Sequence, residues 1–251
     1  MRIYLTGSLA VESGATLLGE REFPGRQGRL AFAFLAAERH RPVPRDELAE
    51  VLWGEGLPSS WETSLSAIVS NLRKLLSRIG MEGKEALRWE GASYRMALPG
   101  DVWVDVEEAA NSLDRAEGAL RADQPSTAWG FATVASAITR RPFLPGEEGA
   151  WIETQRERLR SVYLRALDAL AEVWMVRGQP SLAVTVAEEA VALDPLREAA
   201  YRRLMRIHQR GGDRGEALRI YERCRTILAE ELGVDPSPET EAMYLQILGR
   251  E

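Results

Sequence analysis

The clearest pattern of apolar and polar positions lies at residues 58–78. Apolar side chains recur there at spacings of three, four and seven residues, and they are Leu65, Ile68, Val69, Leu72, Leu75, Leu76 and Ile79. At 3.6 residues per turn these positions fall on one side of a helix. The spacing therefore predicts an amphipathic helix over residues 58–78, with Ser59 or Ser60 as its N-cap and the apolar stripe in the core.

The opposite face of this predicted helix is unusual because it carries short polar side chains first and cations afterwards. Its members are Thr63, Ser66, Ala67, Ser70 and Lys74, flanked by Asn71, Arg73 and Arg78. A solvated helix normally shows long Glu and Lys side chains, whereas a helix in a nucleic-acid groove needs short side chains for base edges and cations for phosphates. The pattern favours a DNA recognition helix over the alternative of an ordinary solvated face.

The segments around this helix predict a winged helix-turn-helix. Residues 2–11 and 15–23 favour short strands, residues from Gly28 to before Pro42 a helix, and residues 45–52 a second helix that Pro44 opens. Two further short strands, at 86–90 and 93–98, surround a small-residue turn and predict a hairpin. In this fold the third helix enters the major groove and the hairpin, or wing, lies against the DNA backbone.

The predicted wing carries Arg88, Tyr94 and Arg95 as candidate DNA contacts. Cations that alternate on an exposed hairpin are common without any ligand, so solvation is an equal alternative for the two arginines. The ring of Tyr94 could stack on a sugar or support the hairpin from inside, and the second role is favoured.

A 34-residue repeat organises the second half of the chain, where every segment from about residue 106 has helical periodicity. The matched pairs are Leu167 with Tyr201, Leu170 with Leu204, Trp174 with His208, Gly178 with Gly212, Ala183 with Ala217, Ala187 with Tyr221, and Ala190 with Cys224. This is the tetratricopeptide period. A less regular helix pair at 106–120 and 126–140 precedes it across an insertion at 141–146, and a last helix at 238–248 covers it.

Composition and charge restrict the function. The 251 residues carry a net charge of −6; residues 1–105 hold 13 Lys/Arg and 14 Asp/Glu, and residues 106–251 hold 19 and 24. The first part is therefore near neutral, which lowers the expected affinity for DNA. The single Cys224 and the two distant histidines offer neither a zinc site nor a catalytic triad, so we expect no enzyme, no metal and no cofactor. Without a signal peptide or a long apolar run, we expect a soluble cytoplasmic protein with no membrane contact.

Several longer motifs resemble the antibiotic regulatory protein (SARP) family of bacterial transcriptional activators. They are DELAEVLWGE (46–55), SNLRKLL (70–76), SYRM (93–96), FLPGEEGAWIE (143–153) and EALRIYERCRTILAEELGVDPSPET (216–240). The second half resembles the bacterial transcriptional activator domain of that family. The resemblance implies an α+β winged helix-turn-helix domain at residues 1–100 and an all-α tetratricopeptide-like domain at residues 101–251.

The same resemblance implies a promoter-binding activator of transcription. The first domain would read double-stranded DNA, and the second would form a homodimer or contact RNA polymerase or another protein. Carried over by position, the DNA-facing residues are Thr63, Ser66, Ser70, Arg73 and Lys74 on the helix, with Tyr94 and Arg95 at the wing.

Two positions depart from the family pattern and keep an alternative open. Where such helices commonly begin with a basic residue, this chain has Trp61 and Glu62, and where they commonly have Ser-Arg-Leu-Arg it has Asn71 in place of the first arginine. Because two expected basic residues are missing, we expect fewer contacts with DNA phosphates. The alternative is a protein-interaction scaffold with a winged helix that no longer binds DNA. The tryptophans of the second half leave room for a small-molecule pocket, although a core role is favoured.

Overall fold

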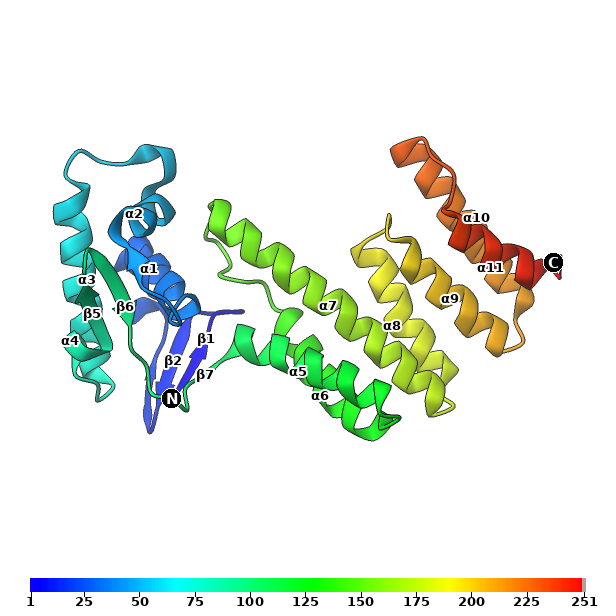
Figure 1. Ribbon diagram of the computed structural model, residues 1–251, viewed down its shortest axis with the longest axis horizontal. Helices are drawn as coiled ribbons and strands as arrows, with labels where there is room; N and C mark the ends of the chain where they lie inside the picture. Colours follow the sequence, from blue (N-terminus) through cyan, green and yellow to red (C-terminus); the bar gives the residue numbers. More distant parts are fainter. Residues whose placement is uncertain (250–251) are drawn as a thin grey trace. The chain divides into compact units, whose positions relative to one another are not determined.

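The computed structural model describes residues 1–249, and the chain divides into two compact units. The first unit comprises Met1–Ala110 and Ile138–Arg160, and the second comprises Asn111–Ala137 and the described residues from Ser161 onward. Figure 1 labels the elements of both. Each unit is described by itself below.

A small sheet begins the first unit. Its strand order is β3-β2-β1-β7, with β1 antiparallel to β2 and parallel to β7, and the strands are Arg2–Tyr4 (β1), Ala10–Ser13 (β2), Thr16–Leu18 (β3) and Trp103–Val104 (β7). The single strand expected over residues 2–11 is wrong, because the chain leaves the sheet after β1 and bends at Gly7, whose φ is 75°. The strand expected over residues 15–23 is too long, since Glu20–Glu22 forms a 3-10 turn (η1).

Three helices and a hairpin complete a winged helix-turn-helix in the first unit (Figure 1). The helices are Gly25–Ala37 (α1), Arg45–Trp53 (α2) and Trp61–Arg78 (α3), with a 3-10 turn at Gly54–Gly56 (η2) and a short helix at Gly83–Ala86 (α4). The hairpin pairs Leu87–Glu90 (β5) with Ser93–Met96 (β6), and Val43–Pro44 (β4) pairs with β6 on its other side. The predicted domain type and hairpin are confirmed.

The apolar stripe of α3 lies in the core as the periodicity predicts. Leu65, Val69, Leu72, Leu75, Leu76 and Ile79 are buried, and Ile68 is partly buried. They pack against the apolar side chains of α1, among them the fully buried Leu30, Phe32 and Leu35. The helix begins at Trp61 and not at residue 58, with Ser60 as the N-cap, although the hydroxyl of Ser60 accepts no capping hydrogen bond.

The segment at residues 141–146, which interrupts the helical pattern of the sequence, belongs to the first unit. The amide of Gly7 donates to the Pro142 carbonyl oxygen at 2.8 Å, and the amide of Leu144 donates to the Leu5 carbonyl oxygen at 3.0 Å. Arg156 then donates to the backbone oxygens of Phe143 and Leu144 in this segment and to that of Glu147 directly after it. Hydrogen bonds therefore hold it along the chain that follows β1.

Helices form the second unit, and the unit boundaries fall within α5, α6 and α7. The elements are Asp105–Arg121 (α5), Pro125–Thr139 (α6), Ala150–Val176 (α7), Pro180–Leu193 (α8), Glu198–Arg210 (α9), Arg214–Leu232 (α10) and Pro238–Leu248 (α11). The repeat positions are confirmed, because Ala183, Ala187, Ala190, Ala217, Tyr221 and Cys224 are all buried. Gly178 and Gly212 have φ values of 68° and 81°, which explains why glycine recurs in the turn of each helix pair.

A buried carboxylate connects the start of α5 to the end of β1. Asp105 is 0% exposed and accepts hydrogen bonds from the amides of Leu5 at 2.9 Å and Thr6 at 2.9 Å. It also accepts from the Thr6 hydroxyl at 2.8 Å and from the Val106 amide at 2.8 Å. These bonds satisfy backbone amides that no strand partner reaches, and a buried amide without a partner is costly.

Replacing this carboxylate should destabilise the first unit strongly. We expect Asp105→Ala to lower the free energy of unfolding by about 3 kcal/mol, because several buried donors lose their acceptor. Asp105→Asn should cost less, since one oxygen still accepts. Denaturant unfolding of the purified chain measures both, and the exposed Asp101 gives the matched control Asp101→Ala, which should stay within about 0.5 kcal/mol of wild type. Equal stability of the Asp105 and Asp101 variants would contradict the anchoring role.

Candidate nucleic-acid interface

The outer face of α3 presents most of the predicted contact residues together. Thr63, Ser66, Ser70 and Lys74 are exposed and lie on one side of the helix, and the exposed Asn71 and Arg78 lie on its edge. The Ser66 hydroxyl donates to the Glu62 carbonyl oxygen at 2.8 Å, so its lone pairs remain available to accept. No carboxylate interrupts α3 between Thr63 and Arg78. This face fits the shape and charge that a groove requires.

Arg73 has a different position from the other cations of α3. It is partly buried, and its Nε donates to the Leu87 carbonyl oxygen at 2.9 Å. The bond joins α3 to the first strand of the wing. Gly83 of α4 packs so closely on the Arg73 backbone that an added Cβ would lie 2.3 Å from its carbonyl oxygen. Arg73 therefore has a structural role as well as a charge.

The wing places both of its predicted cations beside carboxylates. Gly91 and Ala92 have φ values of 51° and 73°, the positive values of a two-residue type I′ turn. Arg88 forms an ion pair with Glu85 at 2.8 Å, and Arg95 lies 3.9 Å from a Glu90 oxygen, so carboxylates offset both wing cations.

Tyr94 lies inside the wing and not on its surface. It is 6% exposed, and its ring meets that of Trp89 edge-on with centroids 4.8 Å apart. Burial raises the pKa of the Tyr94 hydroxyl, which keeps it neutral. These contacts support the interpretation in which Tyr94 supports the hairpin.

A cluster around Arg45 adds residues that the sequence did not single out. The Arg45 guanidinium lies over the ring of Trp61 at 4.9 Å and near that of Trp89 at 6.0 Å, as in cation–π contacts. Its Nη2 is 3.5 Å from Glu62, whose side chain is 65% exposed, and its buried Nε has no hydrogen-bond partner within residues 1–249. Beside it lies a hollow of about 260 Å³ lined by Arg45, Ser66, Val69, Arg73, Trp89 and Tyr94.

Only the pairing of β4 with β6 brings this cluster together. Val43 lies opposite Tyr94 and Pro44 opposite Ser93, which places Arg45 next to the wing. The sequence offered one hint of this cluster, the presence of Trp61 and Trp89 near the predicted recognition helix and hairpin. That both rings contact Arg45 follows only from the register of β4 on β6.

The charge of the interface is modest and is concentrated on α3. Residues 61–96 contain six Lys/Arg and four Glu. In the described part of the chain, Lys74 and Arg78 take part in no ion pair, while Arg45, Arg88 and Arg95 each lie near a glutamate. The positive charge available to a ligand therefore comes mainly from the second half of α3.

Other functional chemistry finds little support among the described residues. Residues 1–249 hold no group of three His, Cys, Asp or Glu side chains placed for a metal ion. Burial raises the pKa of the Cys224 thiol to about 11, so it is not a thiolate near neutral pH. None of the described helices is both long and apolar enough to cross a membrane.

Named relatives cover most of this chain, but the chain covers only part of them. It is 28% identical over 251 residues to the regulatory protein AfsR of Streptomyces griseus, spanning 99% of this chain and 24% of AfsR. It is 29% identical over 224 residues to the transcriptional regulatory protein EmbR of Mycobacterium tuberculosis, spanning 89% of this chain and 58% of EmbR. The transcriptional regulator RedD of Streptomyces coelicolor is 27% identical over 226 residues, which are 89% of this chain and 64% of RedD.

A solved structure and a family description agree with these relatives. The structure of Mycobacterium tuberculosis EmbR in complex with a low-affinity phosphopeptide superposes with a TM-score of 0.89 and 27% identity, over 100% of this chain and 65% of that one. Residues 104–248 match the family described as the bacterial transcriptional activator domain. Since this match covers more than half of the sequence, the chain belongs to the bacterial transcriptional activator domain family.

Proposed function

We propose that the chain is a sequence-specific DNA-binding transcriptional regulator that activates transcription. The observation that carries the proposal is the outer face of α3, which is exposed, free of carboxylates from Thr63 to Arg78, and supplied with Lys74 and Arg78 outside any ion pair in the described chain. In a winged helix-turn-helix the third helix is the one that reads the major groove. Two of the relatives, EmbR and RedD, are named transcriptional regulators, which supports the same function.

The contact residues divide into two roles in this proposal. Thr63, Ser66, Ser70 and Asn71 would meet base edges, because their side chains are short and can donate or accept. Lys74, Arg78 and Arg73 would contact phosphates, with Arg88 and Arg95 adding contacts from the wing. Tyr94 would position the wing from inside.

The two domains would divide the work as the resemblance implies. Residues 1–100 would bind promoter DNA, and residues 101–251 would mediate self-association or contact with RNA polymerase or another protein. Stacked helix pairs of the tetratricopeptide type commonly receive a peptide or a protein helix, which supports a protein partner for the second domain.

A scaffold without DNA binding is the less favoured alternative. The near-neutral balance of residues 1–105 and the presence of Glu62 favour it. Two observations weigh against it. The face of α3 keeps its cations free of ion pairs at Lys74 and Arg78 among the described residues, and the relatives EmbR and RedD are named transcriptional regulators.

Removal of the two free cations of α3 should weaken DNA binding without unfolding the protein. We expect Lys74→Ala combined with Arg78→Ala to lower affinity for a target fragment at least tenfold and to reduce the salt slope by about 2, because each lost phosphate contact removes about 0.9 from that slope. Fluorescence anisotropy titrations at several salt concentrations measure both quantities.

The matched control removes two cations from the second unit. Arg121 and Arg210 are exposed and form no described ion pair, so Arg121→Ala with Arg210→Ala changes the net charge equally. This control should leave the salt slope unchanged. A test variant that binds like the control would contradict the assignment of α3 and favour the scaffold.

A substitution of Glu62 should strengthen DNA binding, in contrast to the removal of Lys74 and Arg78. Because the Glu62 carboxylate lies 3.5 Å from Arg45 at the start of α3, it offsets that cation and repels phosphate. We expect Glu62→Gln to strengthen DNA binding roughly fivefold, which corresponds to about 1 kcal/mol for one charge near the surface. The gain should shrink when Arg45→Ala is also present, and the same anisotropy titration measures this coupling. Unchanged affinity in Glu62→Gln would place the N-terminal end of α3 away from DNA.

A further inference from the structure

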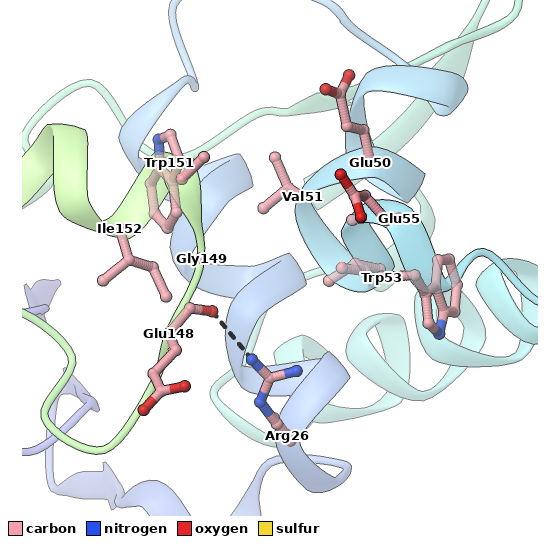
Figure 2. A pocket seen from close by; sticks show the side chains of 12 residues that line it. Arg26, Glu50, Val51, Trp53, Glu55, Glu148, Gly149, Trp151 and Ile152 are labelled. Carbon is pink, nitrogen blue, oxygen red and sulfur yellow. Dashed lines mark hydrogen bonds between the residues drawn. The ribbon is translucent and has the colours of Figure 1, made fainter.

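A second concave site lies in the first unit and takes no part in the proposed interface. It is a pocket of about 520 Å³ formed by the start of α1, the end of α2 with η2, and the start of α7 (Figure 2). Small-molecule sites usually have volumes of about 300–1,000 Å³, so its size fits one organic ligand. Its lining residues are Arg26, Glu50, Val51, Leu52, Trp53, Gly54, Glu55, Glu148, Gly149, Ala150, Trp151 and Ile152.

The pocket has an apolar wall held in place by aromatic contacts. Leu52 and Ile152 are buried, and Trp151 is only partly exposed. The Trp151 ring meets that of Phe34 edge-on at a centroid distance of 5.1 Å and that of Phe143 at 5.5 Å. Such packing fixes the indole in one orientation, so this side of the pocket exists before any ligand arrives.

The only cation among the lining residues is paired within the protein. The Arg26 Nε lies 3.0 Å from Glu147, whose side chain is 4% exposed, and its Nη2 donates to the Glu148 carbonyl oxygen at 3.0 Å. Glu147 also pairs with Arg29 at 2.7 Å, which fixes its position. Two of the three guanidinium nitrogens of Arg26 are therefore engaged by the protein.

The remaining charges of the lining are negative. Glu50, Glu55 and Glu148 are exposed, and none of them forms an ion pair through its side chain in the described chain. The N-terminus of α7 opposes them with a partial charge of only about half an elementary charge. Three carboxylates against this partial charge leave the rim of the pocket anionic.

We propose that this pocket binds a small organic cation with an apolar or aromatic body. The body would fill the space against Val51, Trp151 and Ile152. The ammonium group would lie at the rim beside Glu55, while Glu50 and Glu148 add negative charge from opposite sides of the pocket (Figure 2). The indole of Trp53 adds a face suited to a cation. An anionic ligand would meet three carboxylates, and a neutral one would leave them without a partner. The proposal does not depend on DNA binding.

The experiment compares three probes of one shape on the full chain. They are 1-naphthylmethylamine, which is protonated at neutral pH, the neutral 1-naphthylmethanol and the anionic 1-naphthoate. Isothermal titration calorimetry gives the affinities, and the indole N–H signals of Trp53 and Trp151 in ¹H–¹⁵N spectra report the place of binding. We expect the amine to bind at least tenfold more tightly than the alcohol, to shift both signals, and the naphthoate not to bind.

Two variants and a control separate charge from shape. Glu55→Gln with Glu148→Gln should weaken the amine at least tenfold and leave the alcohol unchanged, while Glu231→Gln on the exposed surface of α10 should change neither. Ala150→Phe places a large ring from an exposed position at the pocket and should abolish binding of both probes, with the fold checked by its melting curve.

Four outcomes would overturn the proposal. They are equal binding of the amine and the alcohol, tighter binding of the naphthoate, an amine affinity that the double glutamine variant does not change, and no amine binding at millimolar concentration. If a basic peptide binds but the amine does not, the proposal is overturned as well, because the pocket then does not take a small organic cation.

Discussion

The buried carboxylate of Asp105 is the contact on which the first unit depends. It accepts hydrogen bonds from the backbone amides of Leu5 and Thr6, at the point where the chain leaves the sheet. These two residues precede Asp105 by about 100 positions in the sequence. In the same short stretch, Gly7 and Leu5 form backbone hydrogen bonds with Pro142 and Leu144. Three distant parts of the chain therefore meet at the end of β1, and the loss of one acceptor would leave several buried donors unpaired.

The residues that hold α3 in place are different from those on its outer face. The apolar stripe of the helix faces the core, and Arg73 joins the helix to the wing through the Leu87 carbonyl oxygen. The face with Ser70 and Lys74 makes no such contact among the described residues. Because the core and the wing hold the helix rigidly, its outer face can present short polar side chains in a fixed geometry.

The first unit carries two surfaces of opposite charge. The second half of α3 presents free cations, whereas the pocket at the end of α2 is lined by Glu50, Glu55 and Glu148, and its one lining cation, Arg26, pairs with Glu147. At about 0.15 M salt the Debye length is about 8 Å, so neighbouring surfaces of a small domain can act on different ligands. The modest net charge of the chain is thus the sum of distinct local fields, and it says little about either surface.

The sequence by itself determined the winged helix, the helical repeat and the buried stripe of α3, because hydrophobic periodicity is a local property of helices and hairpins. It also placed the exposed residues of the α3 face, since a helix fixes which positions share a side. Only the tertiary structure decided the register of β4 on β6, which puts Arg45 between Trp61 and Trp89, and the return of residues 142–147 to the chain after β1. These features depend on contacts between residues far apart in the chain, and local patterns carry no information about such contacts.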